Sequence, residues 1–221
     1  MRQDFVSNVS HEIQSPLTSI SGFTKALKQK KMSEESRLHY LTIIEEECER
    51  LSRLSENLLR LSYLQQETHP LKVRSYRLDE QLRKVVIALE PQWAAKEIEI
   101  DLQLEAMRIQ ADEDQLYQIW INLLSNSIKF TPKHGKIYIE AAMKEDQNVV
   151  SITDNGPGIP EEEQEDIFTP FYKVDKSRNN TVKGNGLGLS IVKKIVDIHN
   201  GNIKVSGRLG EGATFTVKLP K

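Results

Sequence analysis

The sequence contains a single cysteine, Cys48, so no disulfide can form within one chain. The net charge is only −2, and lysine and arginine are spread along the chain. That distribution offers no basic surface for nucleic acid or for anionic lipid. No run approaches the roughly 18 apolar residues of a membrane span, and the N-terminus has no secretory signal pattern. We therefore expect a protein of the reducing cytoplasm, without nucleic-acid or membrane contact in this part of the chain.

The first 66 residues show two helical patterns and no strand pattern. Hydrophobic residues make up 38% of the 221 residues, which is enough for a core in one or two domains. Apolar residues recur at gaps of three or four from 6 to 27 and again from 41 to 61. The polar stretch between them ends the first pattern, and Ser33 is a candidate N-cap of the second helix. These features predict an antiparallel helical hairpin over residues 1–66.

Two helices alone bury only one seam, and such small cores are marginally stable. A second hairpin that packs against the first would complete a four-helix bundle. We therefore expect a homodimer formed through the hairpin. Cys48 falls on the apolar stripe, so we expect it in the core rather than at a reactive site.

The second part of the chain mixes strands and helices. Residues 67–77 are polar, contain Pro70 and are expected to form a linker. Beyond them, the absence of regular strand–helix alternation favours the α+β class, an α/β sandwich with helices on one face of a mixed sheet over residues 78–221. The pattern predicts helices at 78–96, 112–130 and 187–199, strands at 97–104, 136–143 and 148–154, and a hairpin at 202–220.

The stretch NVSHEIQSPLTSI, residues 8–20, places a proline inside a helical pattern and five residues after a histidine. His11 lies about 200° around the helix from its apolar neighbours, so it should face water, with Ser15 on the same face. Pro16 has no N–H, which leaves the carbonyl of Glu12 without its helical partner and allows a bend beside His11. An ordinary solvated histidine and a mobile nucleophile both fit this pattern.

The predicted helix at 112–130 carries polar side chains on one face. Asn122, Asn126 and Lys129 are spaced by four and three residues, while apolar residues occupy the other face. Mg²⁺ prefers oxygen ligands and retains much of its water, and an asparagine carbonyl binds it without adding charge beside a triphosphate. A polar surface stripe is the alternative.

The segment SITDNGPGIP, residues 151–160, ends a predicted strand in a turn with two glycines. A tight turn alone would explain this composition. A binding site would use Asp154 as a buried acceptor for an exocyclic amine, with Gly156 and Gly158 allowing a base to approach the backbone.

Residues 172–186 are too polar to pack in a core and predict a mobile loop, either a linker or a lid. Gly184, Gly186 and Gly188 then precede a helix whose N-terminus can bind phosphate. No strand directly precedes these glycines, and their spacing is not G-x-G-x-x-G, so a dinucleotide-binding fingerprint is excluded. The sequence also lacks the P-loop pattern and the H-R-D and D-F-G motifs of other kinases.

Five segments together resemble the histidine kinases of two-component signalling. They are FVSNVSHEIQSPLTSI, NLLSNSIKFTP, DNGPGIP, IFTPFYKVD and GNGLGLSIV, in the order of that family and over nearly the whole chain. The resemblance implies a dimerisation and histidine-phosphotransfer hairpin followed by an ATP-binding domain of the gyrase, Hsp90, kinase and MutL type. ATP and Mg²⁺ are the implied cofactors.

The resemblance also implies residue roles. His11 would accept the phosphoryl group, Glu12 would hydrogen-bond its ring, and Ser15 would orient water for a weak phosphatase activity. Asn126 would bind the metal, and Asp154 the adenine. The other implied nucleotide contacts are Gln118, Asn122, Lys129, Phe130, Gly156, Gly158, Lys173, Gly184, Gly186, Leu187 and Gly188.

The resemblance further implies phosphoryl transfer from His11 to an aspartate of a response-regulator receiver domain. Two alternatives stay open: an ATP-binding dimeric scaffold without kinase activity, and a clamp-type ATPase. The SHEIQSP segment argues against the ATPase. Because the histidine motif begins so near Met1, we expect this chain to be a fragment, with an upstream region that could carry a membrane anchor.

Overall fold

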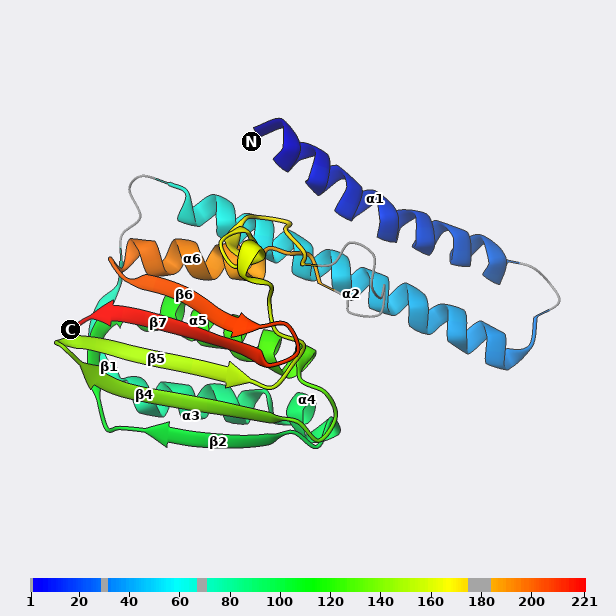
Figure 1. Ribbon diagram of the computed structural model, residues 1–221. Helices are drawn as coiled ribbons and strands as arrows, with labels where there is room; N and C mark the ends of the chain where they lie inside the picture. Colours follow the sequence, from blue (N-terminus) through cyan, green and yellow to red (C-terminus); the bar gives the residue numbers. More distant parts are fainter. Residues whose placement is uncertain (1, 29–31, 67–70, 175–183) are drawn as a thin grey trace. The chain divides into compact units, whose positions relative to one another are not determined.

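The computed structural model describes residues 2–28, 32–66, 71–174 and 184–221 (Figure 1). The chain forms two compact units, Met1–Tyr63 and Leu64–Lys221, and each is described by itself. Parts of the predicted connector at 29–36, linker at 67–77 and loop at 172–186 lie outside the described residues. The boundaries at 66 and 78 therefore stay a prediction.

The first unit is a helical hairpin, as predicted. Helix α1 spans Arg2–Leu27 and α2 spans Glu34–Leu64. The rings of Phe23 and Tyr40 lie 5.0 Å apart between their centroids and join the two helices near the connector. Ser33 Oγ accepts a hydrogen bond from the Ser36 amide at 3.2 Å, so the predicted N-cap is confirmed.

One expectation about the hairpin needs correction, and another stays a prediction. Helix α1 is continuous through Pro16, which is buried, and the bend expected beside His11 stays a prediction. Cys48 is exposed, and the prediction that it lies in the core is wrong for this chain. Leu17 and Leu41, also on the apolar stripes, are 50% and 45% exposed. A pair of helices is too thin to bury residues outside its single seam.

The second unit contains a five-stranded sheet with the order β2-β4-β5-β7-β6. Its strands are β2 (Glu99–Leu104), β4 (Lys136–Lys144), β5 (Gln147–Asp154), β6 (Asn202–Arg208) and β7 (Gly212–Pro220). Strand β2 pairs parallel to β4, and the remaining pairs are antiparallel. The sheet is therefore mixed, as predicted.

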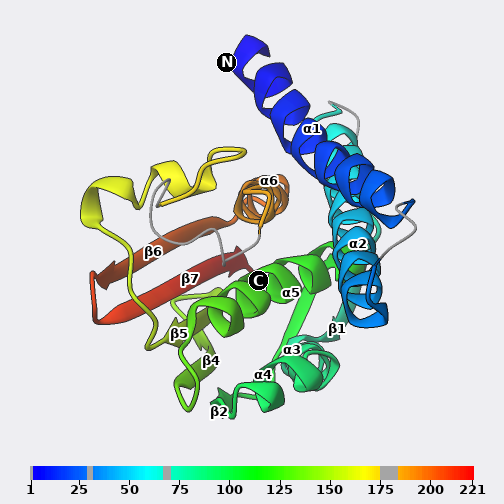
Figure 2. The ribbon, with the colours of Figure 1, turned by 90° about the vertical axis from the view of Figure 1, so that its right-hand side faces the viewer.

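Helices α3 (Leu78–Ala88), α5 (Glu113–Phe130) and α6 (Gly188–Ile198) lie on one face of this sheet (Figure 2). The core between the two layers contains Trp120 and Leu123 of α5, Ile191 of α6, and Ile152 and Val217 of the sheet, all at most 1% exposed. Alternate residues of β5 are buried, as expected for a strand with one covered face. The predicted α/β sandwich is confirmed.

The sequence patterns missed two short strands, β1 (Val73–Arg77) and β3 (Arg108–Asp112), which pair antiparallel. Strand β1 has one buried residue, Tyr76, so it lacks the alternation that marks a strand. It also occupies part of the expected linker. The predicted helix at 78–96 is two helices, because Pro91 starts the short helix α4 (Glu90–Ala95). Two 3₁₀ turns, η1 (Glu161–Glu163) and η2 (Asp166–Phe168), follow β5.

Candidate functional site

Helix α5 positions the polar face that the sequence predicted. Asp112 caps its N-terminus by accepting a hydrogen bond from the Gln115 amide at 3.2 Å. The buried apolar face consists of Leu116, Ile119, Trp120, Leu123, Leu124 and Ile128. Gln118, Asn122, Asn126 and Lys129 are half-buried on the other side, and Phe130 is 45% exposed at the end of the helix. Packing of the apolar face thus fixes which side chains line the site.

The glycine-rich segment before α6 approaches this polar face closely. A Cβ on Gly184 would lie 2.6 Å from Lys129 Nζ, and one on Gly188 would lie 3.5 Å from Asn122 Oδ1. A side chain at position 184 would therefore displace the Lys129 ammonium. Leu187, between the other glycines, is fully buried, so it can contribute to a nucleotide site only through its main chain.

Two lysines contribute positive charge to this part of the site. Burial lowers the pKa of Lys129, and the nearby charge of Lys173 lowers it further. The Lys129 ammonium also lies 4.9 Å from the centroid of the Phe130 ring. An anion such as a polyphosphate would offset the charge of both lysines.

Asn122 has an unused donor that fits the same ligand. Its Nδ2 atom is buried and has no hydrogen-bond partner among the described residues. A buried unpaired amide costs about 1–3 kcal/mol unless a ligand or a water molecule completes it. The orphaned amide, the lysine pair and the glycine approach together fit the phosphates of a nucleotide.

Asp154, at the end of β5, is buried beside α5. Its Oδ1 accepts a hydrogen bond from the Gly156 amide, and its Oδ2 accepts one from Ser127 Oγ, each at 3.0 Å. Burial raises the pKa of Asp154, while the two hydrogen bonds oppose that rise. The sequence motifs did not mark Ser127 as a site residue. Its position on the apolar face of α5, four residues after Leu123, could have identified it as a buried polar side chain.

Gly156 and Gly158, the two glycines after Asp154, are required for different structural reasons. A Cβ on Gly156 would lie 2.9 Å from Asp154 Oδ1 and 3.1 Å from the Phe130 carbonyl oxygen, so the turn rests directly on the end of α5. Gly158 has a φ of +74°, and its Cβ would lie 1.9 Å from the Arg208 carbonyl. The backbone itself therefore requires glycine at position 158.

The described ends of the predicted lid are joined to each other. The Phe171 amide donates to the Gly186 carbonyl at 2.9 Å, and a Cβ on Gly186 would lie 2.7 Å from the Phe171 carbonyl carbon. Lys173, two residues after Phe171, is exposed.

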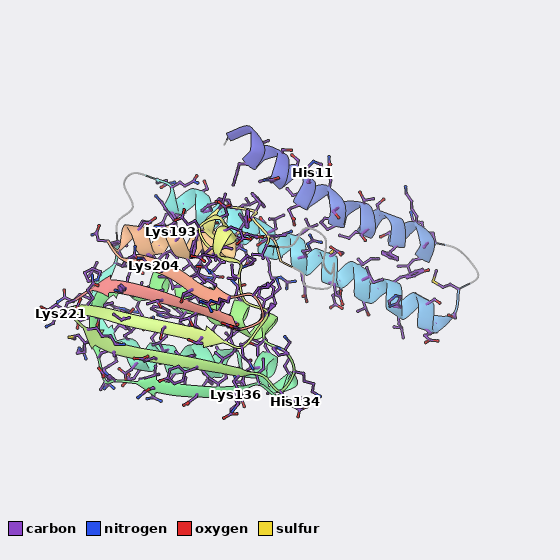
Figure 3. The ribbon with its side chains drawn as sticks, in the orientation of Figure 1. His11, His134, Lys136, Lys193, Lys204 and Lys221 are labelled. Carbon is purple, nitrogen blue, oxygen red and sulfur yellow. The ribbon has the colours of Figure 1, made fainter. Side chains whose placement is uncertain are left out.

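His11, Glu12 and Ser15 belong to the other unit, on α1 (Figure 3 labels His11). His11 and Ser15 are exposed and line an open groove of about 630 Å³ along the hairpin. Glu12 Oε2 accepts a hydrogen bond from Arg50 Nη2 of α2 at 2.9 Å. His11 is thus accessible for chemistry, and the neighbouring carboxylate is held by a cation.

Two family models match the chain. Residues 1–67 match the His Kinase A phospho-acceptor domain, and residues 111–221 match the histidine kinase-, DNA gyrase B- and HSP90-like ATPase. The chain is 34% identical to the sensor histidine kinase YclK of Bacillus subtilis, over 99% of this chain and 46% of that protein. It is 33% identical to the histidine kinase ArlS of Staphylococcus aureus, over 98% of this chain and 48% of that protein. The chain thus spans about half the length of these curated relatives.

Solved structures agree with these matches. Histidine kinase ThkA, in a complex with the response regulator TrrA, is 32% identical with a TM-score of 0.83, over 99% of this chain and 61% of that chain. The catalytic domain of ThkA is 33% identical with a TM-score of 0.60, over 68% of this chain and 96% of that chain. Full-length ShkA in complex with AMPPNP is 29% identical with a TM-score of 0.72, over 98% of this chain and 45% of that chain.

Among the helices that the structure describes, none has the length and apolar character needed to cross a bilayer. One family model matches the first unit and the other matches residues 111–221 of the second, in the order phospho-acceptor domain and then ATPase domain. The chain therefore belongs to the histidine kinase family.

Proposed function

We propose that this chain is an ATP-dependent protein-histidine kinase that phosphorylates His11 and passes the phosphoryl group to an aspartate of a response regulator. The proposal is supported by two features of one chain: an exposed histidine in the phospho-acceptor motif, and a half-buried polar face on α5 that carries Lys129 and the unpaired Asn122 amide. The AMPPNP bound to ShkA and the response regulator bound to ThkA support the nucleotide and the partner. The reaction belongs in the cytoplasm, where ATP is available.

In the proposed reaction, a neutral ring nitrogen of His11 donates its lone pair to the γ-phosphorus of ATP. The bond between that phosphorus and the bridging oxygen breaks, and ADP leaves with the electron pair. Glu12 would accept a hydrogen bond from the other ring nitrogen. A carboxylate accepts several hydrogen bonds, so the Arg50 contact is compatible with this role.

The second unit would hold the nucleotide. Asp154 would accept the adenine amine, Asn122 and Lys129 would contact phosphates, and Lys173 would approach the γ-phosphate. Asn126 would bind Mg²⁺, which supplies charge neutralisation at the phosphates. No group of three or more His, Cys, Asp or Glu side chains in the described part of the chain could hold a metal. The ion would therefore take its other ligands from phosphate and water.

We further propose that the hairpin dimerises. Val6, Leu17, Leu38 and Leu41 are each 45–62% exposed on α1 and α2. A second hairpin against these residues would bury them and complete the predicted four-helix bundle.

Incubation with γ-labelled ATP separates this function from the two alternatives. A kinase places the label on histidine, a clamp-type ATPase releases it as phosphate, and a scaffold does neither. Release of phosphate without labelled protein would contradict the proposal.

Nucleotide affinity is expected to depend on the ionisation of Asp154. The carboxylate accepts the amine in its charged form, and burial raises its pKa. As the pH is lowered, nucleotide affinity should therefore begin to fall at a higher pH than it would with an aspartate of ordinary pKa. Ser127→Ala removes a hydrogen bond that lowers this pKa and should move the fall further upward in pH. Titration calorimetry with ADP across pH measures both. Ser125→Ala on the same helix is the control, and identical profiles for all three proteins would contradict the role of Asp154.

A weak phosphatase activity toward the phosphorylated regulator is expected to depend on Ser15. Its exposed hydroxyl lies one turn after His11 on the same groove, where it can orient water. Serine lacks the γ-methyl that stiffens χ1 in threonine, so Ser15→Thr should raise the rate and Ser15→Ala should remove it. Loss of label from phospho-regulator with ADP present is the measurement. Labelling of His11 should stay unchanged, and equal rates for all three proteins would exclude this role.

A further inference from the structure

Helix α5 ends with carbonyls that its own chain cannot satisfy. The last carbonyls of any helix lack partners one turn ahead. Here the position four residues after Ile128 is Pro132, which has no N–H. The Thr131 amide makes the final helical bond, to the Ser127 carbonyl at 2.8 Å. The end of the helix that carries the nucleotide face therefore needs donors from elsewhere.

Lys96 supplies these donors. Its ammonium donates to the carbonyl oxygens of Ile128, Lys129 and Thr131, at 2.8 Å in each case. An ammonium has three donors and no acceptor, so all three are used. A positive charge at this end also complements the helix dipole. Lys96 is half-buried and donates only to main-chain oxygens in these three bonds. The nearby Lys133 and Lys136 instead form ion pairs with carboxylates at the exposed surface.

The main chain around Lys96 is itself fixed. Lys96 follows α4 in a tight turn, and its carbonyl accepts a hydrogen bond from the His134 amide at 2.9 Å. The Glu99 amide donates to the Gly135 carbonyl at 2.9 Å, so the turn is bound to the loop after α5 on both sides (Figure 3 labels His134 on that loop and Lys136 at the start of β4). The main chain that carries the Lys96 side chain is thus held in place by hydrogen bonds to the loop after α5.

One capped carbonyl belongs to Lys129, and the other two, of Ile128 and Thr131, flank Lys129 and Phe130 in the chain. Lys129 approaches Gly184 with its ammonium, and the Phe130 carbonyl lies against Gly156 next to Asp154. A small shift of this helix end would move the Lys129 charge and the Phe130 ring together, and it would loosen the turn that holds Asp154.

We propose that Lys96 is a positioning residue for nucleotide binding, which fixes the C-terminal end of α5 and with it Lys129, Phe130 and the Asp154 turn. This inference rests on the proposed function, because those groups are the proposed nucleotide contacts. Lys96 itself touches main chain and acts through α5.

The test compares two lysine variants in the full chain. Lys96→Met removes the three donors and keeps the length of the side chain. Lys133→Met is the matched control, because Lys133 is exposed just beyond α5 and its ammonium pairs with the exposed carboxylate of Glu97 at 2.7 Å. Lys96→Met is expected to raise the dissociation constant for ADP about tenfold, within the range by which residues that do not touch a ligand modulate its binding. Lys133→Met should leave it unchanged, and Lys96→Arg should lie closer to the parent than Lys96→Met.

A kinetic measurement separates positioning from general stability. Weaker nucleotide binding raises KM for ATP in His11 labelling and leaves kcat at saturating ATP close to that of the parent. Partial unfolding would instead lower kcat through the amount of active protein and leave KM unchanged. If Lys96→Met does not fold, Lys96→Gln, which keeps two donors, replaces it in both measurements.

A folded Lys96 variant with the ADP affinity and KM of Lys133→Met would overturn the inference. Calorimetry with ADP does not require phosphoryl transfer. A parent chain that binds ADP and leaves His11 unlabelled would therefore contradict the proposed kinase reaction. The role of Lys96 would still be tested separately, by the ADP affinities of its variants.

Discussion

Replacing His11 by glutamine is expected to abolish labelling of the protein by γ-labelled ATP while nucleotide affinity stays unchanged. Glutamine keeps a polar side chain at this exposed position but has no nucleophilic ring nitrogen. The side chain packs little, so the hairpin should remain folded. Label on the parent protein should be lost in acid and survive base, as a phosphorus–nitrogen bond requires.

His39→Gln is the matched control for this experiment. His39 is exposed on α2 of the same hairpin, where its ring lies 6.1 Å from that of Tyr40. The control should label at the rate of the parent. Label that persists in the His11 variant, or label that is stable in acid, would contradict the assignment of the phospho-acceptor.

Replacing Asn126 by alanine is expected to remove the Mg²⁺-dependent part of nucleotide binding. Asn126 is half-buried on the polar face of α5, opposite the residues that hold the helix in the core, so truncation should not unfold the protein. Loss of its carbonyl removes the proposed protein ligand to the ion. We expect the affinity for ADP in the presence of Mg²⁺ to fall at least about 100-fold, beyond the loss typical of a supporting contact.

Calorimetry with and without Mg²⁺ measures this effect directly. In the alanine variant, the two affinities should become equal, whereas in the parent Mg²⁺ should strengthen binding. Ser125→Ala, one residue earlier on α5, should behave like the parent. A variant at position 126 that labels His11 at the parent rate would show that the metal is bound elsewhere.

Local patterns in the sequence account for much of the site. The 3.6-residue period placed Asn122, Asn126 and Lys129 on one face of α5, and the structure keeps them on a half-buried polar face. The same period predicted both hairpin helices. The glycine pattern marked the turns at 156–158 and 184–188. These features are local, because each depends on residues within one or two helical turns.

Long-range contacts were beyond those patterns. The pairings of β2 with β4, of β5 with β7 and of β1 with β3, the bond from Ser127 to Asp154 and the approach of Gly184 to Lys129 all join residues at least 27 positions apart. Burial of Cys48 was predicted from its place on an apolar stripe, but a stripe does not tell which of its residues a neighbour covers.

The sequence by itself therefore determined the elements, their faces and the motifs that belong to the histidine kinase family, since periodicity and turn chemistry act over a few residues. Only the tertiary structure decided how those faces are completed. Pro132 shows from the sequence that the end of α5 lacks a donor, but the donor is Lys96, more than thirty residues earlier in the chain. Such a partner is selected by the folding of the whole unit, because hydrogen bonds depend on distance in space and not on distance along the chain.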